Sequence, residues 1–268
     1  MDAELETLIE AGLRRRSGKK EPPPIVDIIH EDEAIVALNK PAGITSVPGK
    51  IEQTGTYYHA LKEYFEQREG EHFTPRIIHR LDKQTSGLMI IGKHTEAERQ
   101  VAMQFEHHTV RKEYLAVAGG VVHNNEGEIN LPIAPSRKHR VGMEVDPTHG
   151  KEAQTTYTVL ERFRMFSLLL AVPRTGRTHQ VRVHLAAIGH PVAADGVYGS
   201  GEPVRLSEFK PGYKPSKRRE ERPLLSRQAL HCFRITLVSP VTSQPLTLEA
   251  PLARDIAVLL KQLDKYGR

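Results

Sequence analysis

The sequence predicts an α+β fold in which a mixed, largely antiparallel sheet is flanked by helices and loops. Short apolar runs of strand length predominate along the chain, and helical patterns fall between them at irregular intervals. A regular β-α-β alternation, which would favour a parallel sheet, is missing, and no segment repeats at a fixed period.

The composition supports a folded core and narrows the class of protein. The chain has 268 residues, 38% of them hydrophobic and 26% charged, which suits one large domain. Its net charge of +5 permits a polyanionic partner without requiring one. Residues 1–10 lack the apolar core of a secretory signal, and no apolar run is long enough to cross a bilayer. We therefore expect a cytoplasmic protein, and a monomer because nothing in the sequence indicates a partner surface.

Residues 1–24 are interpreted as an N-terminal extension. Leu5, Leu8, Ile9 and Leu13 have helical spacing, and the helix is expected to end at Gly12 or Gly18. A basic group and three prolines, Pro22 to Pro24, then predict an extended linker. The basic group is either a solvated boundary or an arm that contacts RNA. The main domain is predicted to cover residues 25–268.

The first half of this domain alternates strands with two helices. Residues 25–29 and 34–38 are apolar runs of strand length, and 40–43 break the second run. Tyr57, Leu61, Tyr64 and Phe65 fit one helical face. Residues 77–78 and 88–91 predict strands on either side of a polar loop. Thr95 with Glu98 forms a capping-box pattern for a helix whose buried stripe is Ala97, Val101 and Phe105.

The second half has more strands and one long polar insertion. Strands are expected at 114–118, 155–160, 166–172, 229–238 and 246–248, and helices at 180–188 and 252–263. Cys232 is expected to be a core residue within one of these strands. Residues 202–224 carry seven Lys or Arg against four Glu and form a polar, basic insertion. This insertion is either a second RNA contact or a solvated loop.

Two polar segments are the candidates for chemistry. The Asp82 loop, residues 79–87, places an acid beside His79, Arg80 and Lys83 between apolar strands, and nearby positive charge keeps a carboxylate ionised. A surface turn with a local ion pair is the alternative.

The Arg177 segment, residues 174–184, holds three arginines and two histidines. Arg174 and Arg177 suit phosphate, because a guanidinium fork matches phosphate oxygens. Gly176 permits an unusual backbone angle or a close ligand, and Thr178 can cap the helix that follows. Arg182, about one turn into that helix, can point toward a carboxylate from another strand. A basic, solvated helix start is the alternative.

Metal and nucleotide cofactors are not expected. His179 and His184 are five residues apart and fall on different helix faces, and no HExxH pattern occurs. The sequence has no GxGxxG and no GxxxxGK[ST], and the single cysteine makes thiolate metal sites unexpected.

The two segments resemble the RluA family of pseudouridine synthases. The resemblance rests on His79-Arg80-Leu81-Asp82 with Thr85-Ser86-Gly87, and on Arg174 and Gly176 through His184. Four further motifs follow the family's order: Asn39 to Gly43, Lys112 with Tyr114, Gly189 to Pro191 with Asp195 and Tyr198-Gly199, and Arg227 to His231. Together they cover about residues 25–263.

This resemblance implies the pseudouridine synthase fold and the isomerisation of a specific uridine in ribosomal or transfer RNA, without metal or cofactor. Asp82 corresponds to the catalytic carboxylate, Tyr114 to the tyrosine that packs on the target base, and Arg182 to the arginine that pairs with the carboxylate. Arg80 corresponds to the arginine that fills the space of the flipped base. The other expected RNA-binding residues are His79, Lys112, Arg174, Arg177 and His179.

These residue types suit the chemistry. Breaking the bond from C1′ to N1 builds positive charge on the sugar, which a carboxylate stabilises, and an aromatic ring can hold the detached uracil. Asp82 either attacks C1′ or promotes loss of a ribose proton. The chain departs from the family's pattern at Gln84, after Gly43 and at Ala194. Two other classes compete: a non-catalytic RNA-binding protein on the same fold, and a hydrolase that uses Asp82 and releases free base.

Overall fold

The computed structural model of the protein describes residues 3–14, 25–49, 53–70, 73–137, 142–214, 216 and 220–268. These residues form two compact units. Unit 1 contains residues 3–14, Tyr114–His231 and Leu252–Arg268, and unit 2 contains residues 25–113 and Cys232–Pro251. The basic residues Arg15, Arg16, Lys19 and Lys20 and the three prolines lie outside the described residues, as do Lys217 to Arg219 of the insertion.

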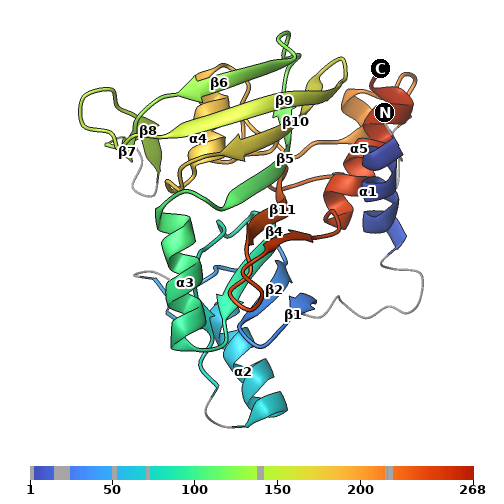
Figure 1. Cartoon of the computed structure of the whole chain (residues 1–268). Coiled ribbons are helices and arrows are strands. Elements are labelled where there is room, and N and C mark those ends of the chain that lie inside the picture. Colours follow the sequence, from blue (N-terminus) through green and yellow to red (C-terminus); the bar gives the residue numbers. More distant parts are fainter. Residues whose placement is uncertain are drawn as a thin grey trace. The chain divides into compact units, whose positions relative to one another are not determined.

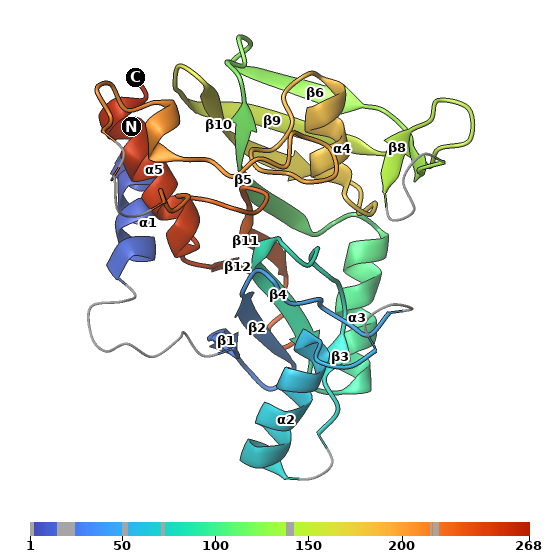
Figure 2. The ribbon, with the colours of Figure 1, turned by 180° about the vertical axis from the view of Figure 1, so that it is seen from behind.

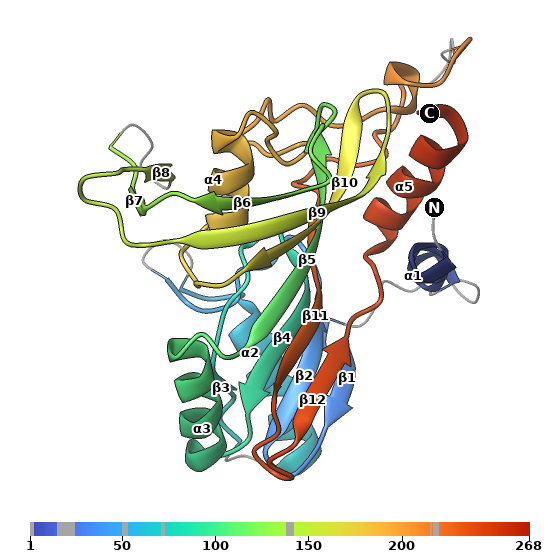
Figure 3. The same cartoon turned by 45° about the horizontal axis from the view of Figure 1, so that its top comes forward.

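Unit 2 is a sheet packed on helix α2. Its strands are β1 (Ile28–Glu31), β2 (Ile35–Lys40), β3 (Arg76–Ile77), β4 (Ser86–Gly92), most of β11 (Leu230–Val238) and β12 (Pro245–Glu249). Strand β2 pairs antiparallel with β1 and β4, β3 pairs with β4, and β12 runs beside β11 (Figure 3). Val36, Leu38, Met89 and Ile91 of the sheet form one buried cluster with the α2 (Tyr57–Glu69) residues Tyr57, Leu61 and Phe65.

The predicted strands and helices of unit 2 are present, with two corrections. The first strand begins at Ile28 rather than at residue 25, and just before it Asp27 accepts hydrogen bonds from both the main-chain and the side-chain amide of Asn39. Helix α3 (Thr95–Glu106) begins after His94 and not after Thr95. The Nδ1 atom of His94 accepts the Ala97 amide at 3.2 Å, so an imidazole nitrogen does what a Ser or Asp oxygen does in the usual pattern.

Unit 1 contains the remaining strands. Strand β10 (Phe166–Pro173) pairs antiparallel with β9 (Gln154–Arg162) and with the unit 1 part of β5 (Arg111–Gly119). Strand β6 (Glu126–Asn130) adds to β9, and β7 (Ile133–Pro135) pairs with β8 (Met143–Val145) as a separate hairpin. Helix α4 (Gln180–Ala187) packs on β9 and β10 (Figure 2). These antiparallel pairings in the two units confirm the predicted α+β class.

Helix α1 (Ala3–Arg14) packs beside α5 (Arg254–Tyr266) in unit 1 (Figure 1). Leu5 and Ile9 are buried, and a Cβ at Gly12 would lie 2.6 Å from the carbonyl oxygen of Leu252. Gly12 therefore permits close helix packing and does not end the helix, which continues to Arg14. Helix α1 therefore belongs to the same compact unit as Tyr114–His231 and Leu252–Arg268.

The described part of the insertion is attached to unit 1. Val204 forms an isolated bridge with Leu225, and a short 3-10 helix, η1 (Leu206–Glu208), follows. Val204 and Phe209 are both buried, so this part of residues 202–224 contributes to the core of the unit. None of the helices in the described ranges is both long enough and apolar enough to span a bilayer.

Candidate functional site: two polar segments held by buried side chains

The Asp82 loop connects β3 to β4 in unit 2. Arg80, Lys83 and Gln84 are exposed, Asp82 is half-buried, and Leu81 and Thr85 are buried. The amide of Thr85 donates to the carbonyl of Asp82 at 3.0 Å, which makes a tight turn after the acid. The loop therefore places its charged side chains outward on a backbone that is fixed from within.

Lys40 fixes this backbone from the end of β2. Its side chain is fully buried. The ammonium donates to the carbonyls of Pro41 at 2.8 Å, Thr85 at 3.2 Å and Lys83 at 3.5 Å. The amide of Gly43 donates to the Lys83 carbonyl as well, at 2.8 Å. A buried ammonium is costly unless its donors are used, and here the carbonyls of the loop accept them.

Ser46 holds the loop next to the acid. Its hydroxyl donates to the Leu81 carbonyl at 2.7 Å and accepts the Leu81 amide at 3.1 Å. The carbonyl of Ser46 in turn accepts the amide of Tyr58, in the first turn of α2, at 3.1 Å. Ser46 is almost completely buried. The residue before Asp82 is thereby fixed, through one serine, to the start of a helix.

Gly87 closes the loop where it enters β4. Its φ of +113° lies in the left-handed region, and a Cβ there would lie 2.1 Å from the carbonyl oxygen of Cys232. No side chain fits at this distance. Cys232 is a fully buried strand residue, as predicted.

His79 is engaged within unit 2. Its Nε2 accepts the amide of Ile90 at 2.9 Å, and its ring stacks on Phe105 of α3 with centroids 4.6 Å apart. Burial, with the nearby charge of Lys112, lowers the pKa of the His79 imidazole to about 3. Burial also lowers the pKa of the Lys112 ammonium, which lies 5.8 Å from the centre of the Phe105 ring.

The Arg177 segment in unit 1 is held by Gln180. The Oε1 atom of Gln180 accepts the Thr175 hydroxyl at 2.7 Å and the Arg177 amide at 3.0 Å. Its Nε2 donates to the Gln154 carbonyl at 2.9 Å and to the Thr155 hydroxyl at 3.0 Å. The oxygen of this buried amide thus holds the loop before α4, and its nitrogen holds strand β9.

The start of α4 differs from the prediction. The N-cap is His179, in the left-handed region with φ of 57°, and not Thr178. Its Nδ1 lies 2.7 Å from the Tyr198 hydroxyl, which also accepts the Met143 amide at 2.8 Å. No side chain caps α4 at His179, and the Tyr198 hydroxyl holds the His179 ring instead.

Arg182 forms a buried ion pair with Asp195. Its Nε donates to Asp195 Oδ2 at 2.7 Å and its Nη2 donates to Oδ1 at 2.8 Å. Burial alone would raise the pKa of the Asp195 carboxyl. The Arg182 guanidinium and the amides of Val197 and Tyr198 outweigh burial and lower that pKa below its usual range. The guanidinium also lies 5.0 Å from the centre of the Tyr198 ring.

The arginines before α4 differ in their anchoring. Arg174 is exposed, whereas the Nε of Arg177 donates to the Glu152 carbonyl at 2.9 Å. Gly176 is not in the left-handed region, and a Cβ there would meet nothing within 4 Å. The expectation of an unusual backbone angle at Gly176 is therefore wrong. Open space beside it remains compatible with a close ligand.

The sequence-predicted site residues divide between the two units. Asp82, His79, Arg80 and Lys112 belong to unit 2. Unit 1 holds the others, which are Tyr114, Arg174, Arg177, His179 and Arg182. Sequence reasoning assigned no role to the side chains that hold these segments, which are Lys40, Ser46, Gln180 and Asp195. The sequence carries no distinctive signal for these four residues, because polar side chains beside apolar runs are usually solvated.

Metal-ligating geometry is absent from the described ranges, where no group of three or more His, Cys, Asp or Glu side chains is placed to hold an ion. His184 is buried: its Nε2 donates to the Leu131 carbonyl, its Nδ1 bonds the Thr155 hydroxyl, and burial lowers its pKa.

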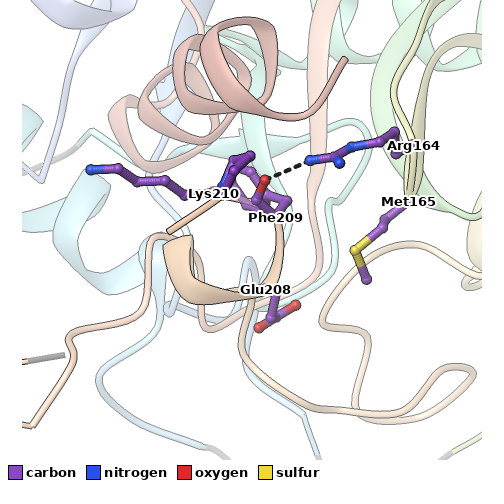
Figure 4. Close-up of a pocket in the computed structure, with 6 residues that line it drawn as sticks. Arg164, Met165, Glu208, Phe209 and Lys210 are labelled. Carbon is purple, nitrogen blue, oxygen red and sulfur yellow. Dashed lines mark hydrogen bonds between the residues drawn. The ribbon is translucent and has the colours of Figure 1, made fainter. Parts of the chain in front are cut away.

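A pocket of about 320 Å³ in unit 1 is lined by Arg164, Met165 and residues 208–211 (Figure 4). There Arg164 donates to the Phe209 carbonyl at 2.8 Å, and no predicted site residue lines the pocket.

Comparison with known proteins connects these segments to one family. Residues 34–187 match the family model described as RNA pseudouridylate synthase. A ribosomal large subunit pseudouridine synthase D from Nitrosomonas europaea is 39% identical over 238 residues, which are 88% of this chain and 64% of that protein. The uncharacterized RNA pseudouridine synthase YhcT from Bacillus subtilis is 36% identical over 241 residues, covering 88% of this chain and 72% of YhcT.

Solved structures agree with the sequence comparison. Human RNA Pseudouridylate Synthase Domain Containing 4 is similar with a TM-score of 0.70 and 26% identity, covering 89% of this chain and 93% of the human chain. This chain spans less than two thirds of the length of the Nitrosomonas relative, so the comparison concerns the shared part.

Proposed function

The chain belongs to the RluA family of RNA pseudouridine synthases, and from that premise we propose that it isomerises a specific uridine in ribosomal RNA to pseudouridine. The observation that carries the proposal is that Asp82, Tyr114 and Arg182 all lie inside the matched region, residues 34–187. The name of the Nitrosomonas relative favours large-subunit ribosomal RNA over transfer RNA as the substrate class.

Asp82 is proposed as the catalytic carboxylate. Cleavage of the bond between C1′ and N1 leaves positive charge on the ribose, which an ionised acid stabilises either by attack at C1′ or by promoting loss of a ribose proton. The reaction is an isomerisation: the uracil leaves through N1 and returns through C5, and the C5 proton is lost to solvent as N1 gains one. It transfers no electrons, so its balance requires no cofactor.

Tyr114 and Arg182 are proposed to complete the site. The tyrosine ring packs on the detached uracil and holds it for reattachment. The guanidinium of Arg182 favours the ionised form of Asp82. The bidentate pairing with Asp195 fixes the position of this guanidinium on the first turn of α4, and the proposed role then depends on the donors that Asp195 does not use.

RNA contacts are proposed for the basic residues around these segments. Arg174, Arg177 and His179 lie just before α4, and the guanidiniums suit phosphate oxygens. Arg80 lies within the Asp82 loop and Lys112 lies in β5, and the exposed Arg80 is proposed to fill the space of the flipped base. We further propose that the enzyme acts as a cytoplasmic monomer on structured RNA.

The test is site-resolved mapping of pseudouridine in total RNA from cells with and without this gene. Wild-type protein should restore one lost position, and Asp82→Asn should not, with turnover reduced about 10⁴-fold or more in purified protein. Arg174→Ala is the matched control, because it removes an exposed charge and should weaken RNA binding while leaving kcat unchanged.

Restoration of the position by Asp82→Asn would favour the non-catalytic RNA-binding class. Release of free uracil from the RNA would favour the hydrolase. Loss of a modification in transfer RNA alone would correct the substrate class but leave the reaction intact.

A further inference from the structure

We propose that His79 is a positioning residue for Asp82, which holds the Asp82 loop through a hydrogen bond from strand β4, and that it does not bind RNA. The inference rests on the proposed function, because it concerns the geometry of the proposed catalytic acid. It also replaces the RNA-binding role that the resemblance implied for His79.

The bond from His79 closes the base of the Asp82 loop. The chain leaves β3 at Ile77 and enters β4 at Ser86, and Ile90 lies in the middle of that strand. The 2.9 Å bond from the Ile90 amide to His79 Nε2 joins the start of the loop to the strand that follows it. Asp82 is three residues beyond this bond. Leu81, between them, is held by Ser46.

The bond requires one protonation state of the ring. An acceptor at Nε2 needs a lone pair there, so the proton of the neutral imidazole is on Nδ1. An imidazolium donates from both nitrogens and cannot accept the Ile90 amide. Burial and the charge of Lys112 lower the pKa of His79 to about 3, so the ring is neutral at neutral pH.

A stacked phenylalanine fixes the plane of the ring. Phe105 of α3 stacks on His79 at an interplanar angle of 20°. Lys112 of β5, itself buried, lies against the same phenylalanine. Turning His79 toward an RNA base would break the bond to Ile90 and the stacking on Phe105 together. The geometry therefore suits a residue that supports the loop.

The experiment replaces His79 by glutamine or by asparagine, whose side-chain amides imitate different nitrogens of the imidazole ring. In His79→Gln the side-chain oxygen reaches the place of Nε2, and in His79→Asn it reaches the place of Nδ1. Full-length His79→Gln should retain kcat within about threefold, and His79→Asn should lose about 10- to 100-fold, because small displacements of a reacting group have effects of this size. The affinity of both variants for the substrate RNA identified by mapping should stay within about twofold of wild type.

His94 provides the matched control within unit 2. It is also a histidine that accepts a main-chain amide, from Ala97 at 3.2 Å, but through Nδ1 and at the start of α3. His94→Asn and His94→Gln should differ in melting temperature, with Asn the better substitute, and should leave kcat unchanged. A difference in kcat between the Gln and Asn variants of His79, with no such difference at His94, would distinguish a positioning role from a general effect on stability.

Equal loss of kcat in both His79 variants would overturn the inference, as would loss of RNA affinity in His79→Gln. If His79→Asn does not fold, His79→Gln decides alone: retained kcat with unchanged RNA affinity supports positioning, and weaker RNA binding overturns it. An inactive wild type would refute the proposed function itself, and the inference with it. An active wild type with no difference between Gln and Asn would refute the inference alone.

Discussion

The Asp82 loop in unit 2 and the Arg177 segment in unit 1 are both rich in charge, yet they are held in different ways. The Asp82 loop is fixed by side chains that precede it in sequence, Lys40 and Ser46, and by a glycine whose missing side chain allows a close contact. The Arg177 segment is fixed by Gln180, the first residue of the helix that follows it.

This difference shows that the residues that fix a loop can be separate from those that carry its chemistry. In the Asp82 loop two of the holding residues, Lys40 and Ser46, lie about 40 positions away from the acid. In the Arg177 segment Gln180 lies within the motif itself, and Asp195 lies 13 residues beyond Arg182. A substitution far from Asp82 in sequence is therefore expected to disturb it more than many substitutions beside it.

The largest expected difference in stability between the two segments is between substitutions at Gly87 and at Gly176. Gly87→Ala should destabilise the protein by about 4 kcal/mol or prevent folding, because the new Cβ would meet the Cys232 carbonyl and the backbone angle is left-handed. Gly176→Ala should change the free energy of unfolding by less than about 1 kcal/mol, since its Cβ meets nothing. Chemical denaturation of both variants measures the two values.

Similar losses of unfolding free energy in Gly87→Ala and Gly176→Ala would contradict the predicted difference between the two segments. They would mean that the loop at Gly87 can relax around a side chain.

A smaller difference in unfolding free energy is expected between substitutions at Lys40 and at Gln180, the side chains that hold the two segments. Lys40→Met should lower the free energy of unfolding by about 3 kcal/mol, because buried carbonyls lose a charged donor. Gln180→Leu should cost about 2 kcal/mol, since the bonds that it removes are between neutral groups. Urea unfolding of both variants at one pH provides the comparison, with the exposed Lys83→Met as control. A larger loss for Gln180→Leu than for Lys40→Met would reverse our ranking of the two segments.

The third effect, the smallest when taken per pH unit, is the pH dependence of stability that His79 gives unit 2. The pKa of His79 is about 3 in the folded protein and about 6.5 when unfolded, so the unfolded state binds the extra proton. Stability is therefore lost as pH falls below about 6.5, by at most about 1.4 kcal/mol per pH unit from this one group. His184, whose pKa burial also lowers, acts in the same direction in unit 1.

His79→Gln should reduce the slope of unfolding free energy against pH between about pH 6.5 and about pH 4.5. Asp195 contributes below that window, because its pKa starts from 3.8 and is lowered. An unchanged slope would show that His79 titrates alike in the folded and unfolded protein.

Much of the fold followed from periodicity. The face of α2 and the β9–β10 pair were predicted because their apolar spacing is regular. Tyr64 is the exception: it fits the pattern of α2 but is exposed. The caps at His94 and His179 were missed because cap patterns emphasise Ser, Thr, Asp and Asn, and here imidazoles occupy the position.

The candidate site was predictable as two segments but not as a structure. Arg182 was expected to face a carboxylate from elsewhere, and its described bidentate partner is Asp195, 13 residues along the chain. Sequence spacing does not reveal such a contact because the turn between them folds back. The buried state of Lys40 was equally hidden, since a lysine at the end of a strand is usually solvated.

Because Lys40 is buried, chemical labelling of its ammonium can report when the Asp82 loop opens. An amine-acylating reagent reaches a fully buried ammonium only when this part of the protein opens, whereas Lys83, exposed in the same loop, reacts at once. The ratio of the two labels after a short pulse, read by mass spectrometry, measures how often the loop detaches from β2. Two lysines 43 residues apart thus record local opening at the proposed catalytic acid without any introduced probe.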